Sequence, residues 1–296
     1  MNTTKKIILA ALVLILVGAI IFTVTMCRNR WNVPGAVNTN KITQTYDITE
    51  NFDSISMKFE TAHVSFVRSN NSRCTIVISD NENTSYNVGV KNSTLYVEKL
   101  NKSGFYLEFG SPTITVYLPR TEYKDLSAVG STGEIDIPST FSFKSIDIEM
   151  TTGDISCSAS ASEIISLRVS TGEIDLESAS TKDLYLHAST GTIEVEDVQC
   201  TAFSSDGSTG YLRLEDVLVS DLMKIERSTG DVRLDNCDAG EIYIETHTGD
   251  ISGSLRSDKV FIARSDTGRI DVPETLSGGK CKLISATGDI EITIKH

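Results

Sequence analysis

Histidine is scarce in this sequence. There are only four in 296 residues, and they share no position in the repeat that fills most of the chain. No Ser-His-Asp spacing and no metal-ligand spacing such as Cys-x-x-Cys is recognisable. The repeats also leave no room for the long insertions with which polysaccharide-cleaving β-helices build a cleft. These absences predict a protein that is not an enzyme.

Basic residues are also few. The chain has 27 Lys and Arg against 40 Asp and Glu, a net charge of −13. Residues 1–30 hold four basic and no acidic residues, so the remainder has 23 against 40, or −17. A nucleic-acid partner needs a basic face, and so does a protein that lies flat on anionic lipid. The charge therefore argues against both.

Helical periodicity is absent after the first 30 residues. A short phrase returns nine times instead, and its glycines are 19 or 20 residues apart. A fixed period of this length is typical of a solenoid, in which each repeat buries its apolar face against its neighbours. We predict one structural corner per coil at Thr132-Gly133, Thr152-Gly153, Thr171-Gly172, Thr190-Gly191, Thr209-Gly210, Thr229-Gly230, Thr248-Gly249, Thr267-Gly268 and Thr287-Gly288.

Apolar residues alternate with polar ones on both sides of each glycine, but in opposite phase. After Gly172 they stand at even offsets (Ile174, Leu176), and before it at odd offsets (Ile165, Leu167). A slip of one residue would turn the strand inside out unless the chain bends, and glycine has the backbone freedom to bend. We therefore predict an all-β fold, a single-stranded parallel β-helix or β-solenoid with 19–20-residue coils. Each coil is strand, corner, strand and a short polar return.

The pattern changes toward the two ends of the repeats. Thr61-Ala62 resembles a decayed corner, so the preceding region is expected to start and cover the solenoid. Before Gly268, Val260 and Ile262 are displaced by one residue, which predicts a β-bulge. The chain stops inside its last strand, which predicts a bare C-terminal edge.

The N-terminal segment has a different character. An apolar run without charges is long enough to span a bilayer, and basic residues flank it on both sides. A cleaved signal peptide is the rival, although no small-x-small site follows the run, and lipidation at Cys27 stays open. We predict a cytoplasmic tail (1–6), a transmembrane helix (7–27), a stalk (28–41), the N-terminal solenoid and cap (42–130) and the regular repeats (131–296), with the solenoid outside the cytoplasm.

Several segments resemble a known family. Phe52-Asp53-Ser54-Ile55, the strand ending at Leu118-Pro119, Tyr123-Lys124-Asp125-Leu126 and the nine Thr-Gly phrases are similar to bacterial β-strand-repeat proteins of unknown function labelled “putative adhesins”. The resemblance covers roughly residues 42 to 296. It implies a membrane-anchored protein of the cell envelope with an adhesin role and, in some relatives, links to envelope-stress systems. It implies no catalytic residues.

Acidic side chains follow the corners. The positions one and three residues after each glycine are expected to point outward and form a solvated stripe, which Arg213, Arg233 and Arg269 interrupt. Clustered carboxylates also suit hard cations. A weak calcium site is therefore the sharper hypothesis, although the glycine-rich pattern of calcium-binding solenoids is absent. Its candidate ligands are Asp136, Asp154, Glu173 and Asp175.

The corner threonines and the cysteines have structural interpretations. Stacked threonine hydroxyls are expected to bond along the solenoid or to satisfy corner backbone groups. A flat threonine array for binding ice or a crystalline surface is the alternative. Cys157 and Cys281 fall on buried offsets as small core residues. A disulfide between Cys74 and Cys200 is neither supported nor excluded.

These features predict a non-enzymatic, membrane-anchored, extracytoplasmic β-solenoid that acts as an adhesin-like binding scaffold at the cell envelope. Its partner is expected to be an envelope polymer or a membrane protein, and no cofactor other than calcium is considered. The alternative is an accessory protein of envelope-stress sensing that acts through a membrane-protein partner. A passive structural rod is the third hypothesis.

Overall fold

The computed structural model describes residues 41–82, 84–100 and 112–295. These residues form strands and loops without a helix, and those from Ile42 onward belong to one compact unit. The predicted transmembrane segment, residues 7–27, lies outside the described residues. Within the described ranges no helix is long and apolar enough to cross a membrane.

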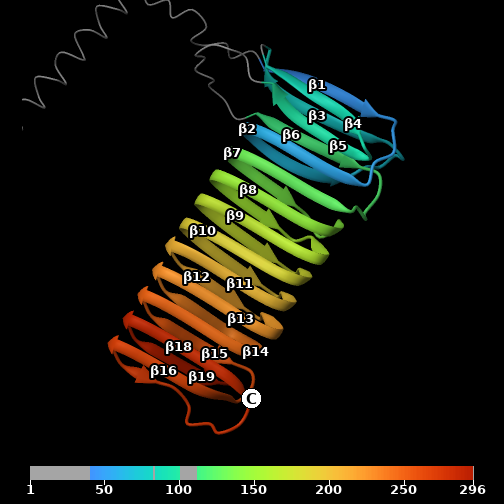
Figure 1. Ribbon diagram of the computed structural model, residues 1–296. Coiled ribbons are helices and arrows are strands. Elements are labelled where there is room, and N and C mark those ends of the chain that lie inside the picture. The colour runs from blue at the N-terminus through green and yellow to red at the C-terminus, as the bar shows by residue number, and fades with distance from the viewer. Residues whose placement is uncertain (1–40, 83, 101–111, 296) are drawn as a thin grey trace, which may run out of the picture. The chain divides into compact units, whose positions relative to one another are not determined.

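The described unit is a parallel β-solenoid, as predicted (Figure 1). Equivalent strands of neighbouring coils pair in parallel, so that Ile146 stands opposite Ile165 and Leu126 opposite Ile146. The coils consist of β2 (Ser54–Arg68), β7 (Asp125–Ile137), β8 (Ser142–Cys157), β9 (Ser160–Glu177), β10 (Ser180–Glu196), β11 (Gln199–Thr209), β12 (Leu212–Glu215), β13 (Leu218–Thr229), β14 (Val232–Thr248), β15 (Ile251–Leu255), β16 (Lys259–Thr267), β17 (Ile270–Asp271), β18 (Gly279–Thr287) and β19 (Ile290–Ile294).

The Thr-Gly phrases stack in register and form the first corner of each coil. Their glycines have φ between +130° and +156°, a region that residues with a side chain rarely adopt. A Cβ on Gly172 would lie 2.0 Å from the carbonyl oxygen of Gly153 in the preceding coil. The corner also reverses the phase of the alternation, so that Leu167 before it and Ile174 after it are both buried.

A second corner follows six residues after the glycine in four of the coils. Its residues have positive φ values of 52° to 56°, and they are Ser178, Asp197, Asp216 and Asn236. Asn and Asp adopt this conformation more readily than other non-glycine residues. The next residue in each of these coils points into the core, as Ala179, Val198, Val217 and Cys237 do. The sequence predicts only a short polar return at this point. In the structure the return also supplies a third buried side of the coil.

The N-terminal end of the solenoid is covered. The first coil is β2, in which Ala62 stands opposite Gly133 and so occupies the first corner. On its other side β2 pairs in parallel with β5 (Thr94–Leu100) and β6 (Thr113–Leu118). The remaining strands, β3 (Cys74–Asn81), which is antiparallel to β6, β4 (Ser85–Lys91), which is antiparallel to β5, and β1 (Lys41–Ile48), which pairs with β3, complete the cap (Figure 1).

The last two coils are stacked in the reverse of their chain order. β14 and β15 pair with β18 and β19, which in turn pair with β16 and β17. The predicted bare C-terminal edge is therefore wrong, because the C-terminal coil lies between two others and buries Ile290 and Ile292. Among the described residues, the edge without a further coil belongs to β16 and β17 (Figure 1).

The inner faces of the two coils carry similar residues. The inserted coil turns Cys281, Leu283, Ser285, Ile290 and Ile292 inward, all buried. The terminal coil offers Phe261, Ala263, Ser265 and Ile270 at the same register, and Val272 also packs against the core.

The predicted bulge before Gly268 is also wrong. The pairing runs without interruption from Lys259 opposite Gly279 to Thr267 opposite Thr287. Register, rather than side-chain size, decides which residues face inward. Val260 and Ile262 therefore point outward and are 39% and 49% exposed.

The described cysteines are buried thiols. Cys74, Cys157, Cys200, Cys237 and Cys281 are all free, so Cys74 and Cys200 form no disulfide with each other. The predicted core positions of Cys157 and Cys281 are confirmed. Burial raises the pKa of each thiol to about 12, so these sulfurs are poor nucleophiles at neutral pH.

An arginine also lies in the core. Arg227 is 3% exposed and stands three residues before its corner glycine, where Met150 stands in an earlier coil. Its Nη2 donates to Ser205 Oγ at 2.8 Å, but Nε and Nη1 have no partner among the described residues. Gly207 makes room for it, since a Cβ there would lie 2.0 Å from Nη1. Burial lowers the pKa of Arg227 to about 10.

Substitution of a corner glycine tests the stacking. We expect Gly172→Ala to lower the free energy of unfolding by about 2–4 kcal/mol, since it combines a strained φ with overlap of the backbone oxygen of Gly153. Thr171→Ala is the matched control, because Thr171 is exposed and adjacent. Denaturant titration measures both changes. Equal, small losses in the two variants would contradict the role of the glycine.

Replacement of the core arginine should stabilise the solenoid. We expect Arg227→Met to raise the free energy of unfolding by about 1–3 kcal/mol, because it removes two unpaired buried donors at a position where another coil carries methionine. Arg213→Met on the outer surface removes the partly exposed pair with Glu215 and the longer contact with Asp235, and should change stability by less than about 1 kcal/mol. A large loss in Arg227→Met alone would show that the guanidinium is needed.

Candidate functional site

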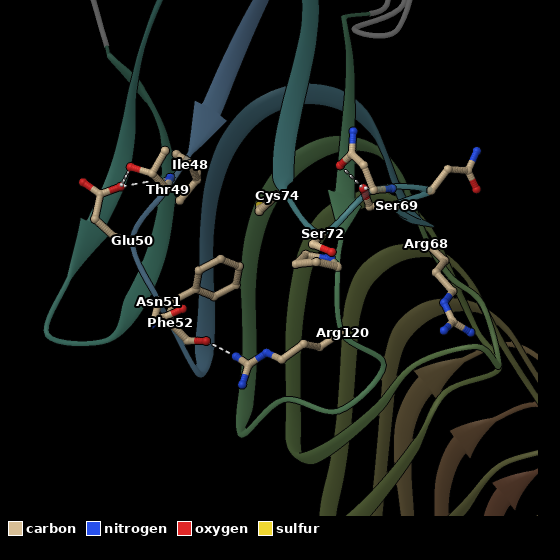
Figure 2. Close-up of a pocket in the computed structure, with 13 residues that line it drawn as sticks. Ile48, Thr49, Glu50, Asn51, Phe52, Arg68, Ser69, Ser72, Cys74 and Arg120 are labelled. Carbon is tan, nitrogen blue, oxygen red and sulfur yellow. Dashed lines mark hydrogen bonds between the residues drawn. The ribbon is translucent and has the colours of Figure 1, made fainter.

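A polar pocket opens in the N-terminal cap, where three loops meet (Figure 2). The loops join β1 to β2 and β2 to β3 and follow β6, and the strand-end residues Ile48, Arg68 and Cys74 line the pocket together with them. The pocket has a volume of about 520 Å³, within the usual range for small-ligand sites. Sequence reasoning missed it, because its lining comes from loops that carry no repeat.

The pocket has an apolar base and a polar rim. Ile48, Phe52 and Cys74 are buried and supply the base together with Pro119. The rim carries hydroxyl, amide and charged side chains, namely Thr49, Glu50, Asn51, Arg68, Ser69, Asn70, Asn71, Ser72 and Arg120. Such a lining can make many directed hydrogen bonds and can also take one apolar face of a ligand.

The two arginines of the rim have different roles. Arg120 donates to the backbone oxygen of Phe52 (Figure 2). It also lies 3.4 Å from Asp53 Oδ1 and places its guanidinium carbon 4.9 Å from the centre of the Tyr123 ring. It is therefore held by the protein itself. Arg68 is exposed and has no hydrogen-bond or ion-pair partner among the described residues. Its guanidinium is free to bind a carboxylate or phosphate group of a ligand.

A clasp fixes the base of the pocket to the next coil. The segments Phe52–Ile55 and Tyr123–Leu126 lie side by side, with Ile55 opposite Leu126. The rings of Phe52 and Tyr123 are stacked at 5.7 Å. Asp53 Oδ2 lies 3.1 Å from Lys124 Nζ, and Ser54 Oγ donates to Asp125 Oδ2 at 3.0 Å. The two motifs that the family resemblance singled out are thus the same position of two successive coils.

The charges of the clasp perturb Asp53. Its pKa is lowered, first by the hydrogen bond and charge of Lys124 and then by Arg120. A carboxyl with a depressed folded-state pKa stabilises the fold above its unfolded pKa of about 3.9 and loses that contribution as the pH falls through the folded value. The clasp should therefore weaken in acid.

Hydrogen exchange tests this acid dependence. We expect the amides of residues 52–58 to lose protection between pH 5 and pH 3 in the parent chain, after correction for intrinsic exchange. Asp53→Asn should show reduced protection already at pH 5, with little further change on acidification. Asp147→Asn removes a carboxylate from another ion pair of the solenoid, that with Arg168, and should leave these amides as in the parent. An unchanged pH profile in Asp53→Asn would contradict the clasp.

The carboxylates proposed for calcium are not gathered into one cluster. Asp154 Oδ1 accepts a hydrogen bond from the backbone N of Glu173 at 3.0 Å, and Asp136 and Asp175 are separated by Ser156 in the register. No group of three or more His, Cys, Asp or Glu side chains among the described residues is placed to hold a metal. The calcium site stays a prediction.

The acidic stripe has a structural use at the corner. The aspartate after the glycine accepts from the backbone N of the next coil in the stack, as in Asp231 from Asp250 N, Asp250 from Asp289 N and Asp289 from Arg269 N. Further along the stripe, burial raises the pKa of Asp175, and the neighbouring charges of Glu177 and Glu173 add to the effect. Acidic side chains are therefore crowded at this part of the stripe.

The corner threonines make no side-chain hydrogen bond among the described residues, which contradicts the stacked-hydroxyl interpretation. Hydroxyls three residues before the corner glycine take this role instead. They donate to the glycine carbonyl of the adjacent coil, as Thr246 to Gly230 O (3.4 Å), Ser285 to Gly249 O (3.1 Å) and Ser265 to Gly288 O (2.9 Å) do.

A Ser-His-Asp arrangement does occur, contrary to expectation. His187 Nε2 lies 3.0 Å from Ser189 Oγ, and His187 Nδ1 lies 2.5 Å from Asp206 Oδ2. The 19-residue period places Asp206 directly beside His187 in the stack, so the sequence signal existed. Acyl transfer also needs donors for an oxyanion, but the backbone amides of β10 are engaged in ladders with β9 and β11. His187, Ser189 and Asp206 thus form a hydrogen-bond ladder between two neighbouring coils.

Comparison with known proteins agrees with this architecture. No curated protein sequence matches the chain. A solved “putative lipid binding protein” from Parabacteroides distasonis ATCC 8503 shares 16% identity over 86% of this chain and 98% of that chain, with a TM-score of 0.52, and so shows the same fold. A “putative adhesin” from Parabacteroides merdae ATCC 43184 shares 16% identity over 86% and 97%, with a TM-score of 0.45. The family model described as Toastrack DUF4097 matches residues 52–296, which confirms the expected resemblance. The chain belongs to this family.

Proposed function

We propose that this protein is a non-enzymatic, adhesin-like binding scaffold of the cell envelope. Residues 7–27 anchor it in the cell membrane as a single helix, and the solenoid stands outside the cytoplasm. The apolar run and its flanking charges support the anchor. The family and the names of the solved relatives fit a binding role.

The observation that carries the proposal is the unpaired Arg68 on the rim of the cap pocket. A ligand with several hydroxyl groups, one apolar face and one carboxylate would match the amides and hydroxyls of the rim, the base around Phe52, and this guanidinium. An acidic saccharide unit of an envelope polymer has these properties. The acidic stripe would at the same time repel polyanions from the side of the solenoid and favour attachment at its cap.

Co-sedimentation of the full-length chain in detergent with purified insoluble cell-wall polymer tests the proposal. We expect saturable binding, and we expect Arg68→Gln to weaken it about tenfold or more, since a charge-assisted hydrogen bond is worth about 1.5–3 kcal/mol. Arg73→Gln is the matched control, because Arg73 is an exposed arginine of the same loop that does not line the pocket.

The outcomes separate the parts of the proposal. Saturable binding that Arg68→Gln leaves intact would place the ligand elsewhere on the solenoid. No binding by the parent chain would contradict a wall-polymer ligand and turn attention to membrane-protein partners. The assay is run with calcium and with EDTA. A loss of binding in EDTA that Asp175→Asn reproduces would support the calcium hypothesis, and equal binding would contradict a role for calcium.

A further inference from the structure

The aromatic base of the cap pocket continues into the solenoid as a stack of three buried rings. Phe52, at the base of the pocket, stacks on Tyr123 at 5.7 Å, and Tyr123 stacks on Phe143 at 6.1 Å. The clasp aligns the first two rings, and the parallel bridge between Glu122 and Ser142 aligns the last two. Because neighbouring strands are about 4.8 Å apart, Phe52 and Phe143 are roughly 10 Å apart along the stack. One apolar floor therefore extends over three successive coils.

A second hollow opens at the far end of this floor. It has a volume of about 400 Å³, within the usual range for small-ligand sites. Its lining begins at Glu122 and Tyr123, two residues after Arg120, where the lining of the cap pocket ends. Phe143 stands opposite Ala161, so the aromatic stack stops there and a small side chain leaves the space open. We call this space the serine hollow.

The serine hollow repeats the chemistry of the cap pocket. Its floor is formed by buried apolar groups, and four serines surround it, namely Ser142, Ser160, Ser162 and Ser180. Ser160 Oγ accepts from the backbone N of Ser180 at 3.0 Å. The hydroxyls of Ser142 and Ser162 make no hydrogen bond within the described part of the chain, so both are available to a ligand. Hydroxyl groups above an apolar floor suit a sugar ring, which has both kinds of surface.

A cation stands at the serine hollow. Lys144 Nζ lies 3.3 Å from Glu163 Oε1, and the two side chains are 54% and 59% exposed. An ion pair that is exposed in this way contributes little to stability. Lys144 can therefore exchange Glu163 for the carboxylate of a ligand. Glu122 also lines the hollow, so we expect the ligand carboxylate on the Lys144 side, away from Glu122.

We propose that the serine hollow is a second subsite for the polymer that the cap pocket binds. One acidic saccharide unit would lie against Arg68 in the cap pocket, and the chain would then run along the side of the solenoid. A later unit would reach the hydroxyls of Ser142 and Ser162 and the ammonium group of Lys144. The ligand is therefore an extended acidic polysaccharide of several units and not a single sugar. This inference rests on the proposed function, because it places the first unit in the cap pocket.

The dependence of affinity on ligand length tests the second subsite. The purified wall polymer is partly hydrolysed and its soluble fragments are separated by size. The affinity of each fraction for the full-length chain in detergent is measured by its competition with the insoluble polymer. We expect the affinity to rise about tenfold or more once a fragment is long enough to span both subsites, since the second contact is then intramolecular.

Matched variants locate the second contact. Ser162→Trp fills the serine hollow from an exposed position, and it should reduce the affinity of long fragments to that of short ones. Lys144→Gln should weaken long fragments about threefold to fivefold and leave short ones unchanged. Ser170→Trp is the control, because Ser170 is an exposed serine of the same strand, β9, that does not line the hollow. Circular dichroism confirms that the variants fold.

The results separate this inference from the function on which it rests. Equal affinities of short and long fragments for the parent chain would overturn the second subsite and leave the cap site in place. The same conclusion would follow if Ser162→Trp and Ser170→Trp bound long fragments equally well. Arg68→Gln should weaken fragments of every length. No binding of any fragment by the parent chain would contradict the proposed function and the second subsite together.

Discussion

The close approach of each corner glycine to the glycine of the neighbouring coil is the constraint on which the solenoid depends. A Cβ on Gly191 would lie 1.8 Å from the carbonyl oxygen of Gly172, and one on Gly210 would lie 1.7 Å from that of Gly191. Contact at this distance leaves no tolerance for a side chain or for a change of register. The period, the inward-facing positions and the aspartate ladder outside the corner all follow from it.

The same constraint leaves the order of the coils open. Every Thr-Gly corner offers its neighbour the same register, so Gly288 can stack on Gly249 as well as Gly268 can. The corner alone therefore does not decide which strand faces solvent at the end of the solenoid.

Much of the fold could be predicted from the sequence because the repeat states it many times over. The 19–20-residue period was enough to predict the corner glycines and the alternating positions around them that are buried. The displaced pair Val260 and Ile262 was misread because side-chain size was weighed above register, which Phe261 and Ala263 follow. The reversed coil order could not be predicted, since identical corners carry no information about the order in which the coils stack.

The candidate site was less predictable than the fold. The cap pocket is built from loops around Phe52, Arg68 and Arg120, whose proximity depends on long-range pairing of β2 with β6 and β7. No period encodes it. The ladder between His187 and Asp206, by contrast, was readable from the 19-residue spacing, because outward positions one coil apart are neighbours.

Disulfide trapping of the last coils tests most directly whether the C-terminal coil is inserted. Ser252 stands opposite Glu291, and Glu291 stands opposite Asp271 on its other side. Ser252 and Asp271 are therefore two coils apart. Adjacent strands are about 4.8 Å apart, whereas cysteines whose Cα atoms are more than about 7 Å apart cannot be bridged. The structure predicts an intramolecular disulfide in Ser252→Cys/Glu291→Cys and none in Ser252→Cys/Asp271→Cys. The opposite result would show that the coils stack in chain order and would remove the free edge of β16.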